Sequence, residues 1–291
     1  MADGCNLYFT EKDLADVEKS IDNKKVIDEG KFAANALDCL VKNNHSDFLK
    51  VLENKSDPRH ESICKLALES FGKGKVDVLE EAKIPIALKT VLKFTPHTTG
   101  LFSSPNKAHG PGASRVLHPY EVLTAAAIVQ QKTIYSKNGK ALHLYSDDKI
   151  FLGHKSAANH AQSKRYGTIE SDVLIQRADK SVAPTGIDAK YARNGVYDFI
   201  SERQLTGIRN SINDGQLKEF FFATNGQFGG KFQDRVSDYN VMLTKDWVKD
   251  NKEYHSIKDT SKEYIEKNYH QLVKDYHIPQ INMCENVSFK T

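Results

Sequence analysis

Two short segments in the middle of the chain alternate between polar and apolar residues with the period of a β-strand. They are residues 170–176 (ESDVLIQ) and 186–191 (GIDAKY). The stretch 177–185 between them contains Ala-Asp-Lys-Ser and Ala-Pro-Thr, which are typical of a turn or loop. The pattern therefore predicts two strands that pair as a hairpin.

The alternation places acidic and basic side chains on one face of this hairpin. Glu170 and Asp172 share a face of the first strand, and Asp188 and Lys190 share a face of the second. Carboxylate oxygens are hard ligands that suit Mg²⁺ or Mn²⁺. A metal held by two carboxylates can activate water beside a phosphate, and a nearby lysine can orient that water or neutralise developing charge. The hairpin thus predicts a site for phosphodiester hydrolysis.

Helices and a further strand are predicted around the hairpin. Residues 118–129 form a helix with proline in its first turn, and residues 201–213 form a helix with a serine cap and an apolar face. Residues 218–226 (KEFFFATNG) predict a buried strand that ends in a turn, and residues 229–240 predict another helix. The predicted order is helix, strand, strand, helix, strand, helix.

This combination resembles the PD-(D/E)XK nucleases, the superfamily with the restriction-endonuclease-like fold. Asp172, followed by Asp188-Ala189-Lys190, is similar to the family's D…(D/E)-x-K signature, although no proline precedes Asp172. The resemblance covers residues 117–245 and implies a mixed α/β fold, in which helices flank a core sheet. It also implies a metal-dependent endonuclease that hydrolyses phosphodiester bonds, with DNA as the favoured substrate and Mg²⁺ or Mn²⁺ as the cofactor.

The resemblance implies roles for individual residues. Asp172 and Asp188 would bind the metal, and Lys190 would position water or stabilise the transition state. Glu121 would be a third acid, because the family often offers a glutamate from the helix before the strands, and Glu170 is the other candidate for this role. The alternative interpretations are a first-turn acid that complements the helix dipole for Glu121 and a surface acid at the strand edge for Glu170.

Basic residues surround the hairpin in sequence and can hold phosphates while the acids hold metal. The candidates for contact with nucleic acid are Lys155, Lys164, Arg165 and Arg193. Gln204 joins them, because some family members carry a glutamine on the helix after the strands. An ordinary solvated surface is the alternative, and a net charge of +3 does not decide between the two. Residues 153–167, which include three of these cations, are predicted to form a short helix that ends at Gly167.

The rest of the chain is predicted to be largely helical. Apolar periodicity in the N-terminal third predicts helices near residues 26–41, 46–53, 57–71 and 84–94. Four parts follow from this pattern: a helical packing or recognition domain at 1–94, a linker or loop rich in Pro, Gly and Ser at 95–116, the nuclease-like domain at 117–245, and a helical tail at 246–291. We expect the nuclease-like domain to fold without the first part.

The four cysteines, Cys5, Cys39, Cys64 and Cys284, do not form a CxxC pair or a metal-ligand spacing with histidine. We therefore expect free thiols in a reducing compartment. No apolar run is long enough to span a membrane, and the first residues lack the pattern of a classical signal peptide. These features predict a protein that acts in the cytoplasm and has no membrane partner.

The resemblance leaves the biological role open. Nuclease domains with a helical extension occur in restriction enzymes, in phage-encoded nucleases and in interbacterial toxins. A restriction enzyme would imply a homodimer, and a toxin would imply an inhibitor (immunity) protein as partner. The alternatives are a catalytically inactive nuclease fold that binds nucleic acid or another protein, and an RNase on the same scaffold. Sequence specificity and the choice between DNA and RNA are not predicted.

Overall fold

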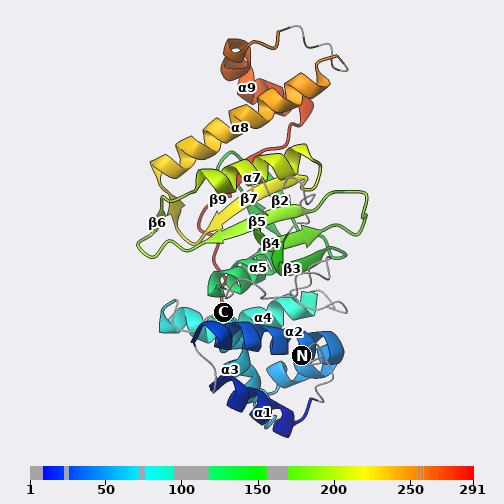
Figure 1. Ribbon diagram of the computed structural model, residues 1–291, viewed down its shortest axis with the longest axis vertical. Helices are drawn as coiled ribbons and strands as arrows, with labels where there is room; N and C mark the ends of the chain where they lie inside the picture. The colour runs from blue at the N-terminus through cyan, green and yellow to red at the C-terminus, as the bar shows by residue number, and fades with distance from the viewer. Residues whose placement is uncertain are drawn as a thin grey trace.

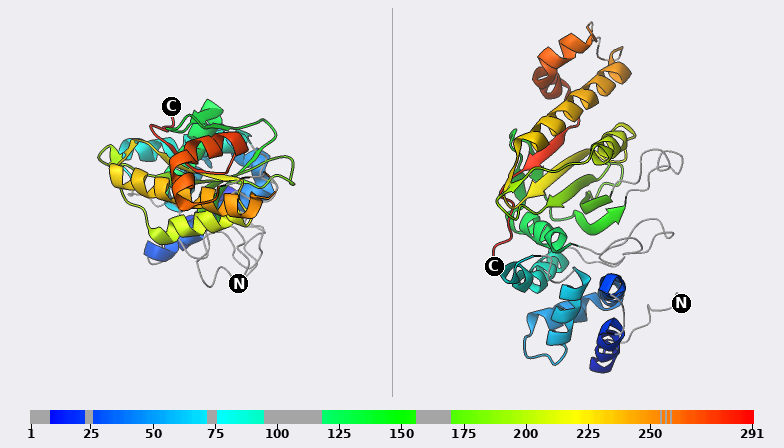
Figure 2. Two further views of the ribbon diagram at one scale, coloured as in Figure 1. Left: turned by 90° about the horizontal axis from the view of Figure 1, so that it is seen from above. Right: turned by 60° about the vertical axis from the view of Figure 1, so that its left-hand side comes forward.

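The computed structural model describes residues 9–22, 26–71, 76–94, 118–155, 170–253, 255, 257 and 259–291. Over these residues the protein has a mixed α/β architecture (Figure 1). A group of N-terminal helices lies on one side of a β-sheet, and two long C-terminal helices lie on the other side. A second view shows the same succession of layers along the long axis (Figure 2).

Helices α1 to α4 form the N-terminal layer: α1 (Glu11–Asp22), α2 (Val26–Glu53), α3 (His60–Ser70) and α4 (Val78–Phe94). Helix α2 covers both of the predicted helices 26–41 and 46–53. Asn44 lies between them and has a non-helical φ of −134° and ψ of 30°, so α2 is kinked at this point. The two predicted helices are therefore the two halves of one kinked helix.

Helix α5 (Pro119–Gln131) is buried on every side, since each residue from Pro119 to Val129 is buried. Helix α4 packs on one side of α5, and strands of the sheet pack on the other (Figure 1). Apolar side chains from α1 to α5 and from the facing side of the sheet belong to one hydrophobic cluster. The predicted linker at 95–116 lies outside the described residues. Independent folding of the parts on either side of it stays a prediction, and the shared core weighs against it.

The described residues include a five-stranded sheet with the order β3-β4-β5-β7-β9. Strands β3 (Lys149–Lys155), β4 (Glu170–Gln176) and β5 (Thr185–Lys190) are antiparallel, and β7 (Glu219–Thr224) and β9 (Ile281–Cys284) add in parallel. Helix α7 (Glu202–Asn213) connects β5 to β7, because parallel neighbours need a crossover. The predicted hairpin, the two helices that flank it and the following strand are confirmed in type and in place.

Side chains of the sheet alternate between two hydrophobic clusters on opposite faces. Val173 and Ile187 pack in the cluster that contains α5, whereas Leu174 and Phe222 pack in the cluster that contains α7 and α8. Asp172 and the even-numbered residues of β5 therefore lie on the α7 face. The sequence pattern predicted this shared face, and the structure confirms it.

Strand β3 occupies a place where the sequence predicts a helix. The helix prediction for residues 153–167 is wrong for residues 153–155, and residues 156–167 lie outside the described part. His154 and Lys155 pair with Ser171 and Glu170 of β4. Pairing with a distant strand has overridden the local pattern here, because strand propensity depends on the neighbouring strand.

The C-terminal part is only partly helical. Helix α8 (Gly230–Asn251) extends beyond the predicted range 229–240 and crosses the predicted boundary at 245. Helix α9 (Lys262–Tyr276) packs against α8, and β9 then returns the chain to the edge of the sheet. Residues 246–291 are therefore not a separate helical tail.

Smaller elements complete the described structure. Strands β1 (Thr133–Tyr135) and β2 (Ala141–His143) form a hairpin, and β6 (Val196–Tyr197) pairs in parallel with β8 (Gln227–Phe228). No helix in the described residues has the length and apolar character needed to cross a membrane.

The cysteines differ in part from the sequence prediction. Cys64 and Cys284 are free thiols, whereas Cys39 is disulfide-bonded. The expectation of free thiols is therefore wrong for Cys39, because sequence spacing does not show which cysteines the fold brings together.

Candidate functional site

The candidate site lies where strand β4 separates from strand β5. Their pairing runs from Ile175 opposite Thr185 to Val173 opposite Ile187 and then stops. Pairing between β5 and β7 continues as far as Lys190 opposite Thr224. The acids therefore occupy the first positions beyond the antiparallel ladder, where one neighbouring strand has diverged.

Beyond the end of the pairing between β4 and β5, the side chain of Asp172 bonds to the backbone of β5. Its Oδ2 accepts a hydrogen bond of 2.8 Å from the backbone N–H of Ala189. This bond holds the carboxylate across the gap between the strands and next to Asp188, with which it shares a side-chain contact. Asp172 is 7% exposed and Asp188 is 4% exposed, so the pair is almost withdrawn from solvent.

Asp188 is held by two further side chains. Lys190 Nζ lies 2.8 Å from Asp188 Oδ1, and Gln204 Nε2 of helix α7 donates a hydrogen bond to Asp188 Oδ2. Ser201 caps helix α7, because its hydroxyl accepts a hydrogen bond of 3.2 Å from the backbone N–H of Gln204. Two acids, a lysine and a glutamine thus converge from β4, β5 and α7.

Lys190 is more accessible than Asp188, although its side chain is only 15% exposed. Its Nζ lies 5.7 Å from the ring centroid of Tyr197 and 5.9 Å from that of Phe222. Burial disfavours the charged form of Lys190, but the carboxylates of Asp188 and Asp172 outweigh this effect and raise its pKa. Lys190 is therefore a fixed cation on the face of the sheet that holds the two acids.

The pKa of Asp188 is shifted far from its ordinary value. Burial, and then the negative charge of Asp172, raise the pKa of Asp188 to about 7, against the opposing effect of Lys190. The two carboxylates are in contact, so their protons are shared and the titration belongs to the pair. A proton or a cation between the carboxylates relieves their repulsion near neutral pH.

This shift predicts a pH dependence of stability in the metal-free protein. The pKa of Asp188 is raised from 3.8 in the unfolded chain to about 7 in the folded one, so the folded state binds more protons between these values. Its contribution to stability is fully present below pH 3.8 and is lost as the pH rises through about 7. We expect the free energy of unfolding to fall more steeply over this range in the wild type than in Asp188→Asn. Parallel pH profiles from denaturant titrations would contradict the assignment.

Glu121, the first predicted third acid, has a structural role in α5. Its Oε1 accepts a hydrogen bond of 2.8 Å from the backbone N–H of His118, and His118 Nδ1 accepts one of 3.2 Å from Tyr120. These bonds form a capping box at the start of α5. Helix α5 packs on the face of the sheet opposite Asp172 and Asp188. A metal-binding role for Glu121 stays a prediction.

The structure describes the backbone of Glu170 at the start of β4, paired with Lys155. Its place as an alternative third acid also stays a prediction. Within the described residues, no three His, Cys, Asp or Glu side chains are grouped so that they could hold a metal ion. The candidate metal ligands that the structure brings together are therefore the pair Asp172 and Asp188.

The predicted nucleic-acid contacts are described only in part. Lys155 is the last residue of β3, and Lys164 and Arg165 lie outside the described residues. Arg193 is exposed in the turn that follows β5, three residues after Lys190. Gln204 contacts the site itself rather than an outer surface, because it donates to Asp188. Among the four predicted basic contacts, Arg193 is the one whose side chain the structure describes as exposed.

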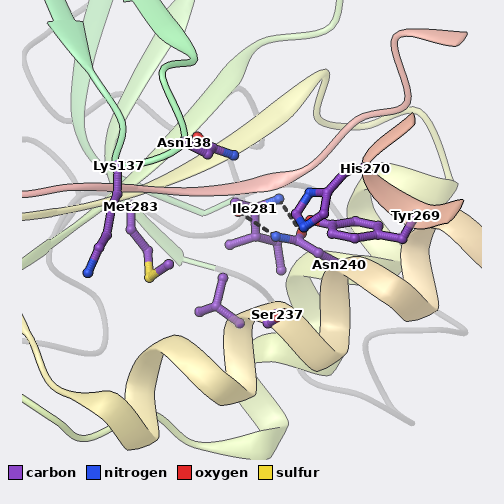
Figure 3. Close-up of a pocket in the computed structure, with 9 residues that line it drawn as sticks. Lys137, Asn138, Ser237, Asn240, Tyr269, His270, Ile281 and Met283 are labelled. Carbon is purple, nitrogen blue, oxygen red and sulfur yellow. Dashed lines mark hydrogen bonds between the residues drawn. The ribbon is translucent and has the colours of Figure 1, made fainter. Parts of the chain in front are cut away.

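A separate cavity of about 170 Å³ lies between the sheet edge and helices α8 and α9 (Figure 3). Several polar side chains in its lining are already hydrogen-bonded. Asn240 exchanges two hydrogen bonds with the backbone of Ile281, at 2.7 and 2.9 Å. Lys137 Nζ donates to Gln233 at 2.8 Å, and Tyr269 donates to Gln280 at 3.1 Å. Because these bonds already use the side chains of Lys137, Asn240 and Tyr269, the acid pair remains the candidate site.

Comparisons with models of protein families, with curated proteins and with solved structures find no match to this chain. Functional inference therefore rests on the geometry of the site.

Proposed function

We propose that this protein is a metal-dependent nuclease that hydrolyses phosphodiester bonds, with DNA as the favoured substrate. The observation that carries the proposal is the convergence of Asp172, Asp188 and Lys190 on one face of the sheet. A structural ion pair requires one acid and one base. Lys190 balances the charge of only one carboxylate, so the second acid in contact with the first is better explained by a cation that both acids bind.

The order of elements supports the resemblance to PD-(D/E)XK nucleases. Helix α5 is followed by the antiparallel strands β3, β4 and β5, then by the crossover helix α7 and the parallel strand β7. This succession is similar to the core of that superfamily. The proposed metal ligands lie on the two strands that carry the family signature, and Gln204 lies on the helix that follows them.

The donor set suits a hard divalent cation. Asp172 and Asp188 are almost withdrawn from solvent and offer carboxylate oxygens, which favour Mg²⁺ or Mn²⁺ over softer metals. Burial and the charge of Asp172 raise the pKa of Asp188, so neutralisation of the pair by a bound cation would be favourable. When bound, the metal supplies Lewis-acid polarisation of a phosphate and a water of lowered pKa.

The protein's own side chains have separable roles in this proposal. The backbone N–H of Ala189 fixes Asp172, and Gln204 fixes Asp188, so both carboxylates are oriented before a ligand arrives. Lys190 keeps its proton and presents a positive charge beside the acids. That charge can stabilise negative charge that develops on the phosphate.

The low solvent exposure of the site supports a second function. Asp188 is 4% exposed and is already bonded to Lys190 and Gln204, so the group is a satisfied buried network as it stands. A catalytically inactive fold that binds nucleic acid or another protein would retain such a network for stability. The two functions differ in whether the site accepts a metal.

A cleavage assay tests the proposal. Purified protein would be incubated with plasmid DNA, linear DNA and single-stranded RNA, each with Mg²⁺, Mn²⁺ or EDTA. We expect cleavage with either metal and none with EDTA, and the comparison of substrates shows whether DNA is preferred. Fluorescence anisotropy with the same nucleic acids separates the alternatives. Binding without cleavage under every condition would favour the inactive fold, and cleavage that persists in EDTA would contradict the metal.

A further inference from the structure

The segment that joins the two sides of the candidate site contains an exposed aromatic residue. Residues 191–201 run from the end of β5, next to Lys190, to Ser201, which caps α7. Tyr197 in this segment faces Lys190, and Gln204 just after it contacts Asp188. Phe199 lies between these two contacts and is 71% exposed. The segment contains strand β6, which is labelled at the left of the sheet in Figure 1.

The backbone around Phe199 is held in place on both sides. The N–H of Gly229 donates to the carbonyl of Tyr197 at 2.9 Å. Asp198 Oδ1 accepts a hydrogen bond of 2.9 Å from the N–H of Phe232, in the first turn of α8. Ile200 is buried in the cluster of α7 and α8. Phe199 is therefore an exposed ring on a fixed backbone, flanked by anchored neighbours.

The segment that contains Phe199 also carries a second exposed apolar residue and an exposed cation, together with the exposed acid Asp198. Val196, in the same segment, is 54% exposed, and Arg193 is exposed in the turn before it. An exposed aromatic ring and an exposed cation in one short segment can bind a nucleobase and a phosphate of the same strand. A ring that stacks on a base requires that the base is not covered by its neighbours in a duplex.

We propose that Phe199 stacks on an unpaired base next to the scissile phosphate, so that the substrate is single-stranded or locally unwound nucleic acid. This inference rests on the proposed nuclease function, because the acid pair and Lys190 place the phosphate. Arg193 contacts a phosphate on the same strand. Phe199 is a specificity residue and takes no part in proton transfer or metal binding.

Steady-state kinetics test the effect of the ring. Phe199→Ala is expected to raise KM for a single-stranded oligonucleotide about tenfold, as loss of one stacking contact predicts, while kcat is retained. Phe199→Tyr retains a ring and should restore KM. The exposure of Phe199 predicts that both variants keep the melting temperature of the wild type. Tyr145→Ala is the matched control, because Tyr145 is an aromatic residue of 55% exposure beside Arg177, away from the site.

A fluorescence signal tests contact without requiring cleavage. The chain has one tryptophan, Trp247, so the double variant Trp247→Phe/Phe199→Trp carries a single reporter at the proposed contact. With Ca²⁺ in place of Mg²⁺, a single-stranded oligonucleotide is expected to quench this tryptophan, and a blunt duplex is expected to quench it much less. The corresponding reporter Trp247→Phe/Tyr145→Trp should show no quenching.

The outcomes separate this inference from the proposed function. Oligonucleotide binding by anisotropy and normal cleavage, without quenching at position 199, would overturn the stacking contact alone. Equal quenching by duplex and single strand would overturn the preference for unpaired bases. Absence of both binding and cleavage for every nucleic acid would overturn the inference together with the proposed function.

Discussion

Replacement of Asp188 by asparagine is expected to reduce metal-dependent cleavage at least about 100-fold, the loss typical when a charged or polar group that acts in the transition state is removed. Asparagine keeps the shape of the side chain and its contact with Gln204, but it removes the charge that would hold the cation. The acid pair then retains one carboxylate, Asp172. The variant should also lose the rise in melting temperature that Mn²⁺ gives to the wild type.

Lys190→Ala is expected to reduce cleavage by a similar factor while metal binding remains. The reason is that Lys190 lies 2.8 Å from Asp188 and contributes positive charge rather than a metal ligand. Metal affinity should therefore rise, because removal of a competing cation leaves two buried carboxylates to be neutralised. Lost cleavage with retained or tighter metal binding would show that Lys190 acts through its charge and does not hold the metal.

Matched controls lie in the loop between the same two strands. Asp179 and Lys180 are both exposed, so Asp179→Ala and Lys180→Ala remove the same charges at a distance from the site. We expect both controls to cleave at wild-type rates. Circular dichroism would establish that each variant is folded, and isothermal titration with Mn²⁺ would measure binding. Wild-type cleavage by both Asp188→Asn and Lys190→Ala would disprove the mechanism.

A fragment that lacks residues 1–94 is expected to be unfolded or aggregated, in contrast to the expectation from the sequence. Helix α5 is buried from Pro119 to Val129 because α4 covers one side and the sheet covers the other. Removal of α1 to α4 would expose several large apolar side chains of α5, at about 1.5–3 kcal/mol each. A few such losses equal the net stability of a typical domain, which is about 5–15 kcal/mol.

Deletion of residues 1–22 alone provides the control. This deletion removes α1, which contacts α2 and α3, and leaves the cover of α5 in place. We expect the shorter deletion to give a monomeric, cooperatively melting protein of reduced stability, as measured by size-exclusion chromatography and thermal circular dichroism. Addition of residues 1–94 as a separate chain should rescue the larger fragment. A monodisperse fragment 95–291 that melts near the full chain would show that the two parts are independent domains.

Local sequence patterns were sufficient for the hairpin and its acids. The period of two in β4 and β5 fixed the shared face of Asp172 and Asp188, because side chains of a strand alternate strictly. Ser201 fixed the start of α7, since a serine cap satisfies an N–H group of the first turn. Family resemblance singled out Gln204 as a contact to nucleic acid, but neither the resemblance nor any local pattern predicted its hydrogen bond to Asp188.

Other elements depend on partners that are distant in the sequence. Strand β9 has only four residues, and its pairing with β7 joins Ile281 to Phe220 across the whole C-terminal part of the chain. Strand β3 contains Gly153 with a φ of +59°, a conformation that glycine adopts readily and that obscures strand periodicity. The continuous core around α5 is also a tertiary property. A helix rich in alanine gives no local sign that both of its sides are covered.

The β-sheet separates the two hydrophobic clusters from each other. The N-terminal helices and α5 pack on one face, whereas the acid pair and Lys190 lie on the other with α7 and α8. Substitutions on the outer surface of α1 to α3 are separated from the acids by a complete layer of backbone, and effects of such distant positions are usually additive. Natural substitutions can therefore change the outer surface of α1 to α3 and the choice of any partner that binds there. The chemistry of the acids on the opposite face of the sheet would be unaffected.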